Sequence, residues 1–150
     1  MKLLKTLLIT ALTLSPLANA NSDLAVSQAY ARATPPNAVN SAVFATFINH
    51  DKADRVIVSA ASDAAEKVEL HDVIVEGEVM KMRQIDSIRV KANSDLVLKP
   101  GSLHIMLLGI TQPLAEGQKV TITLTYEDGG RFSFDAPVKK VMAGMKMKQH

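Results

Sequence analysis

The chain has 150 residues, with 17 Lys and Arg, 15 Asp and Glu, 7 Met, 4 His and no Cys or Trp. A chain of this length can build one domain around a single hydrophobic core without disulfides. The lack of Cys excludes disulfides, thiolate metal sites, iron–sulfur clusters and a cysteine nucleophile. A net charge of +2 and only 4% aromatic residues argue against nucleic-acid binding.

Residues 1–20 have the pattern of a secretory signal peptide. Lys2 and Lys5 form a short basic start, an apolar run follows, and small residues stand at Ala18 and Ala20. The apolar run is much shorter than the roughly 20 residues of a membrane-spanning helix, which favours a cleaved signal with an A-x-A site over a membrane anchor. No Cys follows the run to carry a lipid anchor. Cleavage after Ala20 would leave 15 basic and 15 acidic residues, so the positive balance belongs to the signal.

Residues 21–138 consist of short β-branched runs separated by turn residues, with no sustained helical period. This pattern predicts one all-β domain, an antiparallel β-sandwich or barrel. Asp128-Gly129-Gly130 and Pro100-Gly101 are typical of tight turns, and residues 61–66 allow a helical turn. The predicted strands are 26–32, 42–49, 55–60, 67–75, 79–85, 87–90, 95–98, 103–110, 119–126 and 131–136.

The run from His71 to Met82 predicts a hairpin that joins a histidine to a methionine. If Glu76-Gly77 is its two-residue loop, His71 lies directly opposite Met82, with Cβ atoms about 4.5–5.5 Å apart. Met80 then shares the face of Met82 and lines the same place or replaces Met82 there. An imidazole nitrogen and a thioether sulfur at this distance can bind one metal ion.

A second histidine and methionine follow in the run 103–110. His104 and Met106 are two residues apart, so they lie on the same face of one strand. Two donors from the hairpin and two from this strand would complete a four-coordinate site. The predicted metal ligands are therefore His71, Met82, His104 and Met106. His50 begins a polar turn, and we expect it to be solvated.

The donor types select the ion. Thioether sulfur is soft and imidazole is intermediate, a combination that suits Cu(I) and not Mg²⁺ or Ca²⁺. Zinc sites use Cys, His and carboxylate, and a blue-copper centre needs a thiolate. Taken singly, a strand methionine more often fills a core and a buried histidine more often has a structural role. The hairpin pair, His71 and Met82, and the strand pair, His104 and Met106, are predicted independently of each other. Because both pairs offer one imidazole and one thioether, together they indicate a Cu(I) site.

The spacing His71-x10-Met82-x21-His104-x-Met106 resembles the signature of the periplasmic copper chaperones called PCuAC. The resemblance implies a cupredoxin-like β-sandwich that binds Cu(I) through these four residues. It also implies delivery of copper to respiratory oxidases, especially the CuA centre of cytochrome c oxidase, with an apo oxidase subunit or another copper carrier as partner. Similar segments are Tyr30–Pro36, Val68–His71, Met80–Arg83, Leu98–Gly101, His104–Leu107 and Tyr126–Gly130.

Residues 139–150 differ from the domain before them. They lack a strand pattern and combine four lysines with Met142, Met145, Met147 and His150, which predicts a flexible Met/His/Lys-rich tail. The tail is either a solvated extension kept soluble by its lysines or an auxiliary site for a second copper, Cu(I) or Cu(II). Some relatives of the PCuAC family carry similar extensions.

Two other functions compete with a copper chaperone. One is copper sequestration for tolerance, with no dedicated acceptor. The other is a copper oxidoreductase, which needs an open coordination position, whereas four soft ligands fill the site. A hydrolase is disfavoured because the chain has no G-x-S-x-G motif. The sequence therefore predicts a soluble periplasmic carrier that is not an enzyme, not membrane-anchored and not a nucleic-acid-binding protein.

Overall fold

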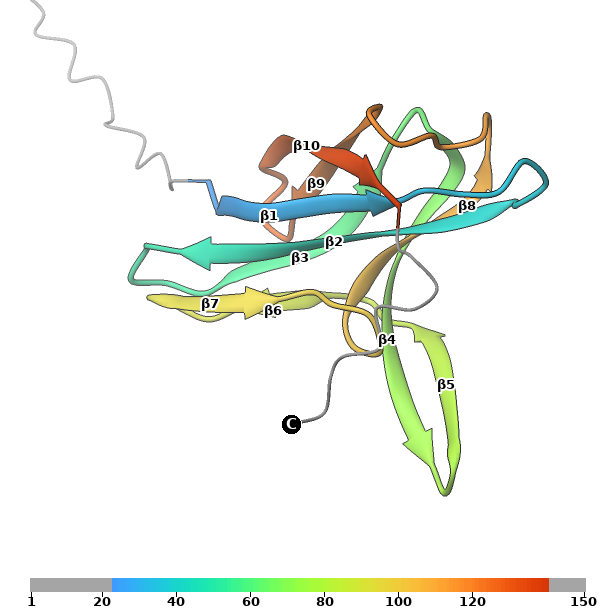
Figure 1. Cartoon of the computed structure of the whole chain (residues 1–150). Coiled ribbons are helices and arrows are strands. Elements are labelled where there is room, and N and C mark those ends of the chain that lie inside the picture. The colour runs from blue at the N-terminus through green and yellow to red at the C-terminus, as the bar shows by residue number, and fades with distance from the viewer. Residues whose placement is uncertain (1–22, 141–150) are drawn as a thin grey trace, which may run out of the picture.

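The computed structural model describes residues 23–140, which form β-strands joined by turns (Figure 1). The strands follow the two-residue alternation of the sequence. Each of the ten predicted runs forms a strand, so the all-β prediction is confirmed. The predicted signal peptide, residues 1–20, and tail residues 141–150 lie outside the described residues. The strands are β1 (Ala25–Arg32), β2 (Asn40–Asn49), β3 (Arg55–Ala61), β4 (Ala65–Glu76), β5 (Val79–Gln84), β6 (Ile88–Val90), β7 (Ser94–Val97), β8 (His104–Ile110), β9 (Lys119–Tyr126) and β10 (Arg131–Lys139).

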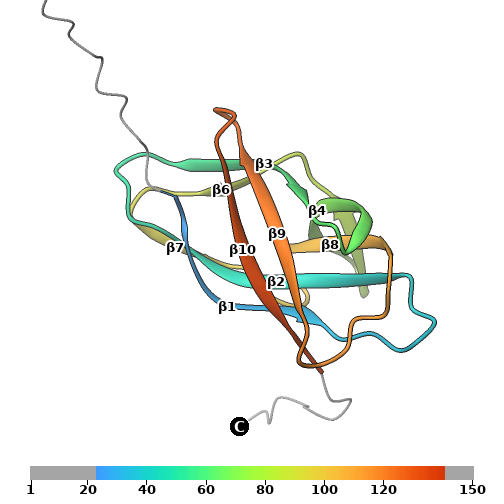
Figure 2. The same cartoon turned by 90° about the horizontal axis from the view of Figure 1, so that it is seen from above.

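The strands join into one hydrogen-bonded path that folds over on itself into two layers. The first layer holds β5, β4, β8, β2 and β1 in that order, with β7 also paired to β2. The second layer holds β10, β9, β3 and β6. Figure 2 shows β9 and β10 crossing over β1 and β2, as in the predicted sandwich. No helix in residues 23–140 is long and apolar enough to cross a membrane.

Neighbouring strands are antiparallel, as predicted, with one exception. The ends of β1 and β10 pair in parallel, Ala31 with Val138 and Arg32 with Lys139. A parallel pair cannot be closed by a short hairpin, and here it joins the first and last strands and links the two layers. This parallel pair adds one detail to the predicted antiparallel sandwich, and β10 extends one residue beyond the predicted domain end at Val138.

The core between the layers decides which side chains point outward. On β8, Ile105 and Leu107 are fully buried, and on β4, Leu70 is buried in the same core. Because successive strand residues point to opposite faces, the neighbours of these residues point away from the core. We call this outer side of β4, β5 and β8 the donor face. It carries Glu69, His71, Met80, Met82, His104 and Met106.

The β4–β5 hairpin turns at Gly77-Glu78 and not at the predicted Glu76-Gly77. Glu76 pairs with Val79, and the φ of Gly77 is +64°. A glycine with positive φ at the first central position is typical of a type II′ turn. The predicted loop would instead have placed Glu76 at this first central position, where the positive φ strains a residue with a side chain. The predicted pairing of His71 with Met82 was therefore wrong.

The true register nevertheless keeps Met82 on the predicted face. His71 pairs with Gln84, and Val73 pairs with Met82. The error is two residues along the partner strand, and strand side chains return to the same face every two residues. Met82 is thus a diagonal neighbour of His71, at a typical separation of roughly 7–8 Å, rather than a direct one.

Beyond His71 the hairpin has no second partner strand. β8 pairs with β4 only from Ala65 to His71, so the rest of β4 is bonded to β5 alone. Figure 1 shows the hairpin standing out from the body of the protein. On the side opposite the donor face, the Arg83 guanidinium donates two hydrogen bonds, of 2.8 and 3.0 Å, to the Asp72 carboxylate. This ion pair ties the two strands together near the base of the hairpin.

The two predicted tight turns are confirmed. Ser102 N donates to Lys99 O at 3.0 Å across Pro100-Gly101, and Gly101 has a φ of +80°, as a type II turn requires. Gly129, at a φ of +86°, lies in the turn between β9 and β10. Residues 61–66 form no helical turn, because β4 begins at Ala65.

Candidate metal centre

The pairing of β4 with β8 places two of the predicted ligands face to face. His71 and His104 are direct cross-strand partners, and their ring centroids are 5.6 Å apart. Met106 lies two residues further along β8 and pairs with Glu69. Three of the four predicted ligands therefore come from two adjacent, hydrogen-bonded strands.

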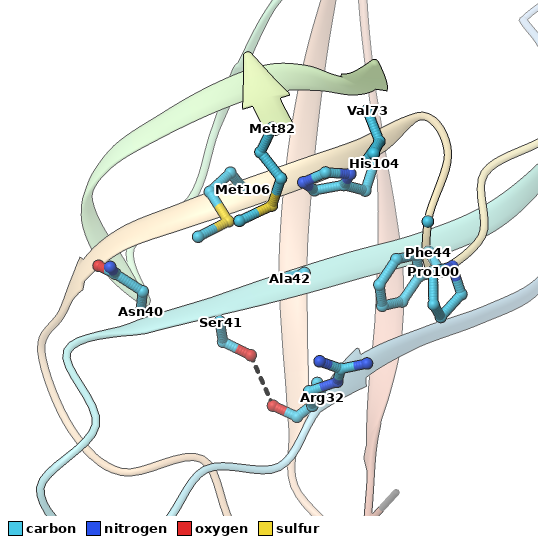
Figure 3. Close-up of a pocket in the computed structure, with 11 residues that line it drawn as sticks. Arg32, Asn40, Ser41, Ala42, Phe44, Val73, Met82, Pro100, His104 and Met106 are labelled. Carbon is cyan, nitrogen blue, oxygen red and sulfur yellow. Dashed lines mark hydrogen bonds between the residues drawn. The ribbon is translucent and has the colours of Figure 1, made fainter. Parts of the chain in front are cut away.

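The fourth, Met82, reaches the same place from β5. Together with His104 and Met106 it lines a hollow of about 220 Å³ on the donor face. Figure 3 shows the sulfur atoms of Met82 and Met106 next to each other, with the His104 ring beside them. The structure thus brings three of the four predicted residues to one hollow. His71 does not line the hollow and lies beside it, next to the His104 ring. The other residues that line the hollow are Arg32, Asn40, Ser41, Ala42, Phe44, Val73, Pro100 and Gly101.

His104 is held so that one ring nitrogen remains free. Its side chain is buried, with 3% of the residue exposed, and its Nδ1 lies 2.8 Å from the Ser102 carbonyl oxygen. A carbonyl only accepts hydrogen bonds, so Nδ1 carries the proton and donates it. His104 Nε2 is buried without any hydrogen-bond partner. Its lone pair is available to a metal ion.

His71 is held by the opposite nitrogen. Its Nε2 lies 2.6 Å from Oε2 of Glu69, and both side chains are largely buried, with 13% and 10% exposed. The Glu69 carboxylate accepts this hydrogen bond, which leaves the lone pair of the neutral ring on Nδ1. His71 Nδ1 is also buried without a partner. Each histidine of the site therefore has one anchored nitrogen and one free nitrogen.

This arrangement has the chemistry of a metal centre. Metal-ligating histidines commonly donate their second ring N–H to a carboxylate or a backbone carbonyl, which fixes the tautomer and the ring orientation. A buried polar atom without a partner costs free energy, so unpartnered atoms in a native structure need an explanation. A bound metal ion would satisfy both free nitrogens at once. The residues present therefore fit a metal ion.

The neutral ring of His104 and the ionised carboxylate of Glu69 suit a bound cation, although the positively charged Arg32 also lines the hollow. Burial lowers the pKa of His104, so its ring stays neutral and able to ligate at neutral pH. The hydrogen bonds from Lys67 and then His71 hold the pKa of Glu69 below its usual value, so this carboxylate is ionised. Two imidazoles and two thioethers would leave the charge of a cation uncompensated. Glu69 supplies a negative charge that is separated from the bound cation only by the imidazole ring of His71.

The methionines are essential to the donor set. Within residues 23–140, no three His, Cys, Asp or Glu side chains are grouped so that they could hold a metal ion. The three methionines in this part of the chain, Met80, Met82 and Met106, all lie on the donor face. His50 is exposed and does not line the hollow, as expected.

Sequence reasoning missed two features of the site. One is Glu69, for which the available signal was its place two residues before His71, on the same strand face. The other is the apolar wall of the hollow, which includes Phe44 from β2 and Pro100 from the turn before β8. Phe44 comes from a distant part of the chain, and its ring centroid lies 6.1 Å from that of His104.

The comparisons with known sequences identify a family and two relatives. Residues 24–138 match the family model described as LpqE-like. The chain is 36% identical over 100 residues to Lxx21020 of Leifsonia xyli subsp. xyli, which is named as a lipoprotein. It is 33% identical over 90 residues to RP573 of Rickettsia prowazekii. The matches cover 66% and 59% of this chain but only 60% and 50% of those relatives.

Solved structures share the fold. The copper-bound PCuAC domain of PmoF2 is similar with a TM-score of 0.67 at 19% identity, over 81% of this chain and 97% of that domain. The Cu(I) form of DR1885 from Deinococcus radiodurans has a TM-score of 0.62 at 29% identity, over 78% of this chain and 80% of that protein. These likenesses confirm the cupredoxin-like fold that the sequence resemblance implied.

The hydrogen bonds predict which nitrogen of each histidine carries the proton. We expect neutral His104 to be protonated at Nδ1 and neutral His71 at Nε2, and we expect His104 to titrate below the ordinary pKa of 6.5 because it is buried. Long-range ¹H–¹⁵N NMR spectra recorded against pH measure both properties, and His104→Gln assigns the signals. A proton on Nε2 of His104 at neutral pH would contradict this description of the site.

Proposed function

The chain belongs to the LpqE-like family, and from this membership, its fold and its donor set we propose that it is a periplasmic copper chaperone. In this proposal it binds one Cu(I) through His71 Nδ1, His104 Nε2 and the sulfur atoms of Met82 and Met106. The ion is cargo, and the protein delivers it to the copper centre of a respiratory oxidase. The PCuAC domains that share this fold include copper-bound forms, which supports copper as the cargo.

The observation that carries the proposal is the pair of free nitrogens. His71 Nδ1 and His104 Nε2 are buried and unpartnered, on directly paired residues whose rings are 5.6 Å apart. Met82 and Met106 line the hollow beside His104. Two imidazole and two thioether donors suit Cu(I), whereas zinc, magnesium and calcium sites use different donors.

The exposure of the donors favours delivery over storage. The two rings are largely buried, but Met82 is 59% exposed. Thioether and imidazole ligands are neutral and bind less tenaciously than thiolates, so an acceptor can compete for the ion. Since four donors would fill the coordination sphere, we propose that the protein is not an enzyme. Sequestration for tolerance is the main alternative, because it would use the same site without an acceptor.

Copper binding is tested by titrating the protein with Cu(I) in competition with a chromophoric chelator. We expect one equivalent at the site in a chain ending at Lys140. Met82→Leu with Met106→Leu should weaken the affinity by roughly 100-fold, about 2.8 kcal/mol of binding free energy, because two of four donors are lost. Val79→Leu, on the opposite face of the hairpin, is the matched control. An unchanged affinity in the double variant would refute the proposed site.

Glu69 should tune this affinity without binding the metal. Glu69→Gln preserves the shape of the side chain but removes its charge and weakens its hold on His71 Nε2. We expect the Cu(I) affinity to fall by about 10–100-fold, the usual range for a residue that supports a metal-ligating histidine. Lys67→Gln is the control, because Lys67 contacts Glu69 from an exposed position. An affinity loss no larger than that of the control would contradict this role.

Delivery is tested by mixing the Cu(I)-loaded protein with an apo oxidase subunit that contains an empty CuA centre. We expect the CuA absorption to form faster than it does with the same concentration of Cu(I) held by a small chelator of matched affinity. Equal or slower transfer would favour sequestration. Catalytic consumption of oxygen or peroxide by the loaded protein would instead indicate an oxidoreductase.

A further inference from the structure

The proposed ligand set leaves one methionine of the donor face without a role. Met80 is 62% exposed, so it contributes little to the core. An exposed apolar side chain forgoes the stabilisation that burial would give, and a polar residue would suit an exposed edge strand better. The chain nevertheless places Met80 on the same face as both proposed thioether ligands. A purely structural role as a core filler therefore does not explain it.

Met80 does not line the hollow but ends beside it. It pairs with Val75 and lies two residues before Met82 on β5. Its Cε lies 3.7 Å from the point where a Cβ would stand on Gly101, and Gly101 lines the hollow. The thioether end of Met80 therefore lies against the turn that borders the hollow.

The proposed donors become softer and more exposed from the inside outward. His104 is 3% exposed, Met106 is half-buried, Met82 is 59% exposed and Met80 is 62% exposed. An ion that approaches from solvent would therefore meet sulfur before nitrogen. Thioethers are suited to such a position because they carry no proton, so a copper–thioether bond can form or break without proton transfer.

We propose that Met80 is a transit ligand for Cu(I) at the mouth of the site, an inference that rests on the proposed function. On release, a Cu(I) bond to Met80 Sδ forms as the bond to Met82 Sδ breaks, and the acceptor's ligands then replace the remaining donors. Loading runs in the reverse order. Copper stays Cu(I) throughout, so no electron or proton is exchanged.

Spacing separates this role from that of a permanent ligand. An antiparallel strand rises about 3.4 Å per residue, so the backbones of Met80 and Met82 are roughly 7 Å apart. Met80 is thus one step further than Met82 from the histidines. Its loss should change the rate of transfer and leave the equilibrium affinity nearly unchanged, whereas the loss of Met82 should change the affinity.

The test measures both quantities in Met80→Leu, which keeps the volume and apolar character of the side chain. The probe is bicinchoninate, a chromophoric Cu(I) chelator, mixed with the loaded protein in a stopped-flow instrument. We expect the affinity to stay within about twofold of wild type and the transfer rate to fall at least fivefold. Val75→Leu, directly opposite on the same face, is the matched control and should change neither quantity.

A rescue variant separates chemistry from packing. Val75 pairs directly with Met80 and is 67% exposed, so Val75→Met in the Met80→Leu background returns a thioether to the rim. We expect it to restore at least half of the lost rate. Unchanged rates in Met80→Leu, or an affinity loss as large as that of Met82→Leu, would overturn the transit role alone. If the wild-type protein binds no Cu(I), both the transit role and the proposed function are overturned.

Discussion

The register of β4 against β8 is the constraint on which the site depends. It places His71 opposite His104, and it is fixed from the other side of the sheet. Leu70 and Ile105 are also paired and are buried in the core. A slip of either strand by one residue would turn its buried apolar side chain outward and bring its histidine into the core. The hydrophobic core therefore sets the spacing of two polar rings that are not part of it.

Hydrogen bonding converts this placement into a donor pair. Glu69 holds Nε2 of His71, and the Ser102 carbonyl accepts from Nδ1 of His104. Each anchoring hydrogen bond uses one ring nitrogen, so the second nitrogen of each ring is left buried and unpartnered, with its lone pair available. The folded protein carries the cost of these two unsatisfied atoms. That cost is acceptable at a site where a ligand can remove it, and it would be difficult to explain in an ordinary core.

The sequence was sufficient for the parts of this site that depend on local periodicity. Alternation identified the strands, and the two-residue spacing of His104 and Met106 placed them on one face. The predicted hairpin register was wrong because Gly77 fits either of two positions in the loop. Met82 was still predicted on the correct face of the sheet, because the register error was two residues. Glu69 was missed because its role depends on a rotamer that reaches His71. The parallel pairing of β1 with β10 was missed because it joins the two ends of the domain.

The proposed ligands also differ in how firmly their strands are held. β8, which carries His104 and Met106, pairs with β4 on one side and with β2 on the other. His71 is the one residue of β4 that pairs with both β8 and β5. Met82 lies on β5, an edge strand bonded to β4 alone. Local opening costs least where a strand has one neighbour and little burial. A small movement of the edge strand can therefore exchange the Met82 thioether for that of Met80 while the core keeps the two imidazoles and Met106 in place, which is the order of events that the proposed transit role needs.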